Sequence, residues 1–113
     1  MKKIALCFFF TLIIFSAVRS ADKKIDSLQV LLKNSKEDTS KAWLNNLIGE
    51  VYFNFSPDSA MLFWNRAEQI ANAGINAGAE KQKYLSFKKT IAEVLNSKGA
   101  YFFARGDSKK AIE

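Results

Sequence analysis

The side chains that could perform chemistry in this chain are few in type. The chain has no histidine, and its single cysteine, Cys7, lies in an apolar N-terminal run. Cys/His zinc sites, disulfides and Cys–His nucleophilic catalysis are therefore excluded. A Ser–Lys pair or a carboxylate dyad remains, but the acidic residues are scattered along the chain instead of being paired on one helix face. We expect no enzymatic activity, no metal site and no cofactor.

The first 20 residues form a segment of their own. A positive start, Lys2-Lys3, precedes an almost unbroken apolar run from Ile4 to Val18, which is shorter than the roughly 20 residues that a membrane span needs. Small residues before Ala21 complete the pattern of a secretory signal peptide, residues 1–20, cleaved after Ser20. The alternative is an uncleaved N-terminal anchor. We expect an exported protein, periplasmic or secreted, whose mature part, 21–113, makes no membrane contact.

The charge of the mature part is modest. Removing three of the 17 basic residues, Lys2, Lys3 and Arg19, lowers the formal net charge from +6 to +3. A net charge of +3 gives no reason to expect nucleic-acid binding. Lysines gather in the last third of the chain, where a solvated helix face is the simpler interpretation and an anionic-ligand patch the alternative.

Apolar spacing and capping signals predict an all-helical mature chain. A short amphipathic helix is followed by a break over 34–38, where Asp38 or Thr39 would cap a helix that runs to about Phe55. Ser56-Pro57-Asp58 then begins another helix, because serine caps well and proline suits the first helical position. That helix ends near Gly74 and Gly78, so the pair forms an antiparallel hairpin.

The last third predicts about 25 further helical residues from Ala79, as one long helix or as two with a kink near Ser86. Leu95 is among its expected buried positions. Gly106-Asp107 would turn the chain, and a helix begun at Asp107 would break off at Glu113. We therefore expect the sequence to stop inside an element, with a longer protein continuing beyond it.

A pattern of small and aromatic residues occurs twice along these helices. The positions expected to pack the helices together are Ile48, Gly49, Tyr52, Ala60, Trp64 and Ala67 in the first copy, and Gly99, Phe102 and Ala111 in the second. Small residues let two helix backbones approach, and the aromatic residues supply the buried area. Glycine inside a helix costs about 1 kcal/mol relative to alanine, so Gly49 predicts a close contact.

This pattern resembles the tetratricopeptide repeat, a helical hairpin that stacks on its neighbours. Asn45 and Lys98 depart from it, because each stands where the family prefers an apolar residue. The two glycines, Gly49 and Gly99, lie 50 residues apart, whereas the family's period is about 34 residues. The alternative is an unrelated helical bundle. Together with its leader, the start of the chain also looks like the exported N-terminal sensor regions of Bacteroidetes-type signalling proteins, in which a membrane span follows the repeats.

The resemblance implies a module that binds a protein or peptide ligand in its groove, as the input region of a signal-transduction protein. The alternative is a structural or assembly scaffold of the cell envelope without a signalling output, and self-association is open in both cases. In such repeats the first helix of each pair lines the groove. The expected contacts are Asn45, Asn46, Glu50, Asn54 and Asn96, unless these are ordinary solvated positions.

Overall fold

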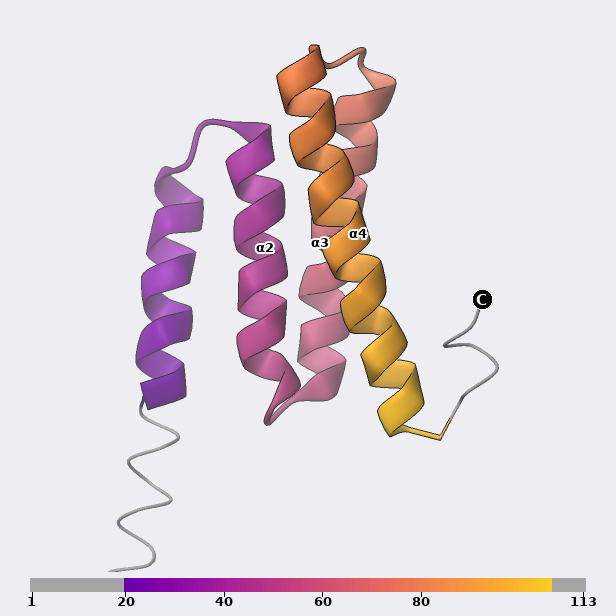
Figure 1. Cartoon of the computed structure of the whole chain (residues 1–113). Coiled ribbons are helices and arrows are strands. Elements are labelled where there is room, and N and C mark those ends of the chain that lie inside the picture. The colour runs from indigo at the N-terminus through magenta and orange to yellow at the C-terminus, as the bar shows by residue number, and fades with distance from the viewer. Residues whose placement is uncertain (1–19, 107–113) are drawn as a thin grey trace, which may run out of the picture.

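The computed structural model describes residues 20–106, and all of its regular structure is helical. A helix over 20–34 precedes α2 (Asp38–Phe53), α3 (Pro57–Asn76) and α4 (Lys81–Ala104). Figure 1 shows consecutive helices running in opposite directions. The all-helical prediction and the antiparallel hairpin of α2 and α3 are confirmed. The predicted signal peptide and the helix expected from Asp107 lie outside the described residues, apart from Ser20.

The start of α2 differs from the prediction. Its N-cap is Glu37, in an extended conformation, and no side chain caps the free amide groups. Asp38 and Thr39 lie inside the first turn, so the prediction that one of them is the cap is wrong. The carboxylate of Asp38 still lies where the helix dipole favours negative charge. At the other end, the carbonyl oxygen of Tyr52 accepts the amide hydrogens of Phe55 and Ser56, which ends the helix two residues early.

The turn before α3 follows the sequence signals closely. Ser56 is the N-cap and Pro57 the first helical residue. The Ser56 hydroxyl, however, donates to the hydroxyl of Ser59 at 2.8 Å and does not bond to a backbone amide. After α3, Gly78 adopts a φ of +82°, a conformation that glycine accommodates without strain.

The fourth element is one continuous helix. At the point where a kink was an open alternative, the Thr90 hydroxyl donates to the carbonyl oxygen of Ser86 inside the helix. The expected burial along α4 is only partly right. Phe87, Val94 and Tyr101 are buried, whereas Leu95 is 52% exposed.

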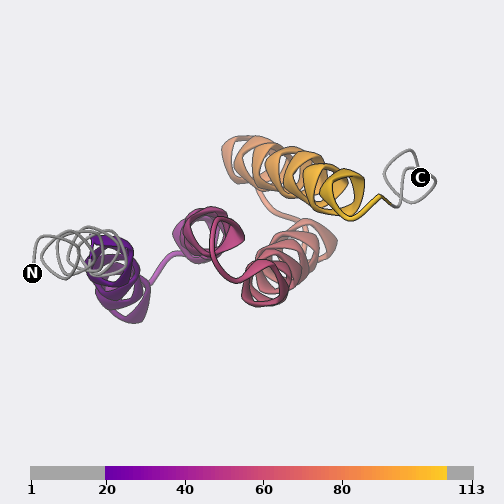
Figure 2. The same cartoon turned by 90° about the horizontal axis from the view of Figure 1, so that it is seen from below.

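The three labelled helices gather into one body, and the helix over 20–34 lies beside α2 on the side away from α4 (Figure 2). Buried side chains of α3 and α4 form the larger core cluster, and a second cluster joins α2, α3 and α4. The first comprises Ala60, Trp64, Ala67, Val94 and Tyr101, and the second Ala42, Ala71 and Phe87. α2 therefore has helices on both flanks, a position that decides which of its polar residues stay accessible.

Glycine marks the closest helix approaches. A Cβ on Gly49 would lie 2.5 Å from Cδ1 and Nε1 of Trp64 and 3.1 Å from the carbonyl oxygen of Ala60. The predicted close contact at Gly49 is confirmed. A Cβ on Gly74 would lie 2.3 Å from the Phe87 ring, so this glycine admits α4 against α3. The sequence pattern indicates only that Gly74 lies near the end of a helix.

Candidate binding groove between α2 and α4

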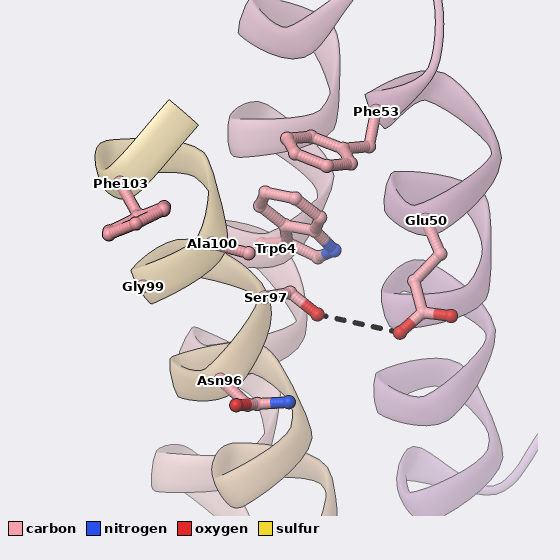
Figure 3. Close-up of a pocket in the computed structure, with 8 residues that line it drawn as sticks. All are labelled: Glu50, Phe53, Trp64, Asn96, Ser97, Gly99, Ala100 and Phe103. Atoms are coloured by element: carbon pink, nitrogen blue, oxygen red, sulfur yellow. Dashed lines mark hydrogen bonds between the residues drawn. The ribbon is translucent and has the colours of Figure 1, made fainter. Parts of the chain in front are cut away.

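A pocket of about 510 Å³ lies between α2 and α4, with α3 as its floor (Figure 3). Its walls combine aromatic, small and polar side chains from all three helices. They are Glu50 and Phe53 of α2, Trp64 of α3, and Asn96, Ser97, Gly99, Ala100 and Phe103 of α4. Gly99 and Ala100 carry little or no side chain, which leaves space between α4 and α2.

Glu50 and Ser97 are the polar pair that spans the pocket. The Ser97 hydroxyl donates to Oε1 of Glu50 at 3.4 Å, which is long for an O–H···O hydrogen bond. Glu50 is exposed and forms no ion pair within residues 20–106. Its negative charge therefore faces the pocket with little internal compensation.

The indole of Trp64 contributes a second polar group. The residue is 1% exposed, and its Nε1–H has no acceptor in the described part of the chain. In Figure 3 the nitrogen lies on the edge of the ring that faces α2 and Glu50. The contact with Gly49 and Ala60 fixes this ring orientation. The nitrogen itself has almost no accessible surface, so a ligand in the pocket cannot reach it, and a buried donor without an acceptor costs about 1–3 kcal/mol.

Aromatic side chains make up the apolar part of the pocket. Phe53 packs on Trp64 with ring centroids 5.6 Å apart, and Phe103 is 74% exposed at the other wall. Elsewhere along the same two helices, the Lys89 ammonium lies 5.2 Å from the Trp43 ring centroid and bridges α4 to α2. The space between α2 and α4 thus holds an apolar pocket next to a carboxylate.

Of the five expected groove contacts, the structure brings Glu50 and Asn96 into this pocket. Asn54 is exposed and lines a neighbouring pocket of about 470 Å³ between the helix over 20–34 and α2. Glu50 lines both pockets and therefore lies between them.

Asn45 and Asn46 require a correction. They are 4% and 1% exposed, so neither offers its side chain to a ligand at the surface. The physical reason is the central position of α2, whose flanks are covered by the helix over 20–34 and by α3 with α4 (Figure 2). Nδ2 of Asn45 donates to the carbonyl oxygen of Lys41 at 2.8 Å. The amide of Asn46 has no partner among the described residues.

The expected packing residues of the first copy lie where two helices meet. Ile48, Ala60 and Ala67 are fully buried, and Gly49 and Trp64 form the close contact. Tyr52 is half-buried and stacks on Phe63 with centroids 5.3 Å apart.

The second copy is described only in part. Phe102 is half-buried with its ring edge-on to that of Tyr101, and Gly99 lines the pocket. Ala111 lies outside the described residues. Lys98, the departure from the apolar pattern, points its ammonium at Glu68 of α3 and forms an ion pair.

Sequence reasoning missed Ser97, Ala100 and Phe103. Phe103 gave a usable signal, because it lies off the buried stripe of α4 and a large exposed aromatic side chain often marks a binding surface. Ser97 and Ala100 gave none, since small residues on a helix have no distinctive pattern. The small-and-aromatic pattern predicts only a packing role for Trp64, and its unpartnered N–H emerges only from the structure.

No group of three or more His, Cys, Asp or Glu side chains within 20–106 could hold a metal ion. In the same span, every helix is too short or too polar to cross a membrane. Comparison with protein-family models, with curated proteins and with solved structures found no match.

Proposed function

We propose that this chain is an exported binding module of the tetratricopeptide-repeat type, which holds a protein or peptide segment between α2 and α4. In this proposal it is the input region of a signal-transduction protein, and the bound segment is the signal. The observation that carries the binding proposal is the pocket itself, because the exposed Glu50 carboxylate lies there beside the apolar side chains of Phe53 and Phe103 without an ion pair among the described residues.

Two features support the repeat-type assignment. The contact of Gly49 with Ala60 and Trp64 joins the residues that the repeat pattern pairs. In addition, α4 follows the α2–α3 hairpin and packs against it, as the first helix of a second repeat would (Figure 2). The pocket then lies between the first helices of successive repeats, where such proteins bind their ligands.

A peptide library displayed on phage, selected against the immobilised full chain, tests the binding proposal. We expect selected peptides to lose affinity about tenfold or more for Ala100→Trp, because the indole would fill the pocket, a loss of about 1.4 kcal/mol. Ala92→Trp is the matched control, since Ala92 is exposed on the same helix and lies outside the pocket. Equal losses in both variants, or no selected peptide, would contradict the proposal.

Export is tested separately. N-terminal sequencing and intact mass of the protein from its host should give Ala21 as the first residue. A protein recovered from the membrane fraction with residues 1–18 intact would show an uncleaved anchor instead.

A further inference from the structure

α4 carries a row of exposed side chains on the side opposite its core residues. The row is Lys81, Leu85, Lys88, Ala92 and Leu95, and their alternating spacing of four and three residues puts them on one helix face. Leu85 and Leu95 are 56% and 52% exposed, and the other three are exposed as well. Both α2 and α3 pack on the other side of α4 (Figure 2). This outer face of α4 is therefore uncovered in the part of the chain that the structure describes.

The first half of α4 has an unbalanced positive charge. Residues 81–92 contain four lysines and no acidic residue, and Glu80 and Glu93 are the nearest carboxylates in the sequence. None of the four lysines forms an ion pair among the described residues. The Lys88 ammonium lies 5.6 Å from the Tyr84 ring centroid, a contact that leaves its charge without a counter-ion. Charge complementarity therefore favours an anionic occupant for the outer face.

The leucines favour a lipid surface over an anionic polymer. Leu85 and Leu95 are 10 residues apart, which is about 15 Å along a helix, and a lysine lies between them in the row. At a bilayer surface, leucine side chains enter the boundary between headgroups and acyl chains. Lysine stems lie along the same boundary and keep their ammonium groups at the phosphates. A nucleic acid or an acidic polypeptide chain would pair with the lysines but leave both leucines in water.

A second copy of the chain fits this face less well. Two outer faces packed on each other would bring Lys81 and Lys88 of both copies into one contact, with no carboxylate on either face. Like charges repel each other more strongly where water is excluded. The uncovered leucines therefore have a better partner in an anionic bilayer than in their own counterparts.

We propose that the outer face of α4 binds the surface of an anionic lipid bilayer. The lysines pair with the phosphates of the headgroups, and Leu85 and Leu95 enter the interface between them. The attraction rises with the number of lysines near the surface and with the apolar area that the interface covers. This contact does not depend on the peptide pocket, and it departs from the sequence-based expectation that residues 21–113 make no membrane contact.

The test places a tryptophan on this face of the full chain with Leu85→Trp. The vesicles contain phosphatidylglycerol as one third of the lipid and a brominated phosphatidylcholine, which quenches indole fluorescence at the interface. We expect the introduced indole to emit at shorter wavelength and to be quenched. Leu62→Trp is the matched control, because Leu62 is 51% exposed on α3, and its indole should be quenched far less. Both variants keep the apolar N-terminal run, so the difference between them reports on α4.

Charge variants show whether the lysines of the face give the affinity. In the Leu85→Trp chain, Lys81→Gln with Lys88→Gln should raise the lipid concentration needed for half-maximal quenching at least about tenfold. Lys23→Gln with Lys24→Gln removes the same charge from exposed positions on the helix over 20–34, and should raise it less than about threefold. Equal losses would mean diffuse attraction between protein and vesicle, and would overturn the inference.

The remaining outcomes identify other occupants. Equal quenching in vesicles of phosphatidylcholine alone would overturn the requirement for anionic lipid. Equal quenching at positions 62 and 85 would mean that the chain enters the bilayer through another segment. If soluble polyglutamate shifts the emission at position 85 as the vesicles do, the occupant is an acidic polymer. If protein concentration alone shifts it, alongside dimerisation in sedimentation, the occupant is a second copy of the chain. Each of these four results contradicts the proposed lipid contact.

Discussion

Gly49 lies at a contact between α2 and α3 that leaves little room for a side chain. Alanine there would improve helix propensity by about 1 kcal/mol, but its Cβ would lie 2.5 Å from the Trp64 indole. The nearest atoms, Cδ1 and Nε1, belong to the five-membered ring of the indole, and Trp64 is 1% exposed, so the ring has little room to move. Overpacking costs typically about 1–3 kcal/mol.

We therefore expect Gly49→Ala to lower the free energy of unfolding by about 1 kcal/mol, measured by urea denaturation with an unchanged m-value. Ala92→Gly, on an exposed helix position, calibrates the propensity effect in the same protein. If Gly49→Ala stabilised the protein by as much as Ala92→Gly destabilised it, the close contact would not exist in solution.

Asn46 is the opposite case, a buried side chain whose polar atoms lack partners. Its amide is 1% exposed, and neither Oδ1 nor Nδ2 finds a hydrogen bond within the described residues. Leucine has the same branched skeleton without polar atoms, and leaving a buried polar group unpaired costs about 1–3 kcal/mol.

Asn46→Leu should consequently raise the free energy of unfolding by about 1 kcal/mol in urea melts. The neighbouring Asn45→Leu is the control, because Asn45 is also buried but donates a hydrogen bond to Lys41 and should gain nothing. Destabilisation by Asn46→Leu would indicate that water satisfies the amide.

At the scale of elements, the hairpin could be predicted because its signals are local. Ser56 and Pro57 specify where α3 begins, and the small residues at Gly49 and Ala60 specify how it meets α2. The burial of Asn45 and Asn46 could not be predicted, because polarity alone does not show that α2 has neighbours on both flanks. Two of the eight residues that line the pocket, Glu50 and Asn96, follow from the repeat pattern as groove contacts. Whether Ser97, Ala100 and Phe103 line it depends on how α4 is rotated about its axis, which also leaves Leu95 exposed.

The contact between α3 and α4 contains an ion pair in place of an expected apolar contact. Lys98 and Glu68 have side chains only 17% and 28% exposed, so solvent screens them less than it screens an open surface pair. This pairing explains why a lysine is tolerated at a position where the repeat pattern favours an apolar residue.

A double-mutant cycle of Lys98→Met and Glu68→Gln should give a coupling energy of about 1 kcal/mol that falls as salt is added. The pair Asp38–Lys41 is the control, since its atoms are 4.0 Å apart and its side chains are 69% and 40% exposed. Its coupling should be near zero. Equal coupling in the two pairs would mean that the Lys98–Glu68 contact adds nothing to helix packing.

At the scale of the whole molecule, the helices differ in how firmly they are held. α3 buries five side chains, Ala60, Phe63, Trp64, Ala67 and Ala71. The helix over 20–34 buries only Ile25, while Val30 and Leu31 are 58% and 56% exposed. Few buried apolar contacts mean a low free energy of local opening. The helix over 20–34 should therefore open separately from the body formed by α2, α3 and α4.

Hydrogen exchange followed by mass spectrometry should show this order directly. We expect backbone amides of 20–34 to exchange at least about tenfold faster than those of α3, because their opening free energy is lower by more than 1.4 kcal/mol. Ile25→Ala should accelerate exchange in 20–34 and leave α3 unchanged, since it removes the one buried anchor of that helix. Leu31→Ala is the matched control at an exposed position and should change little. If Ile25→Ala accelerated exchange equally in α3, the four described helices would open as one cooperative unit. The pocket between the helix over 20–34 and α2 would then open only on global unfolding.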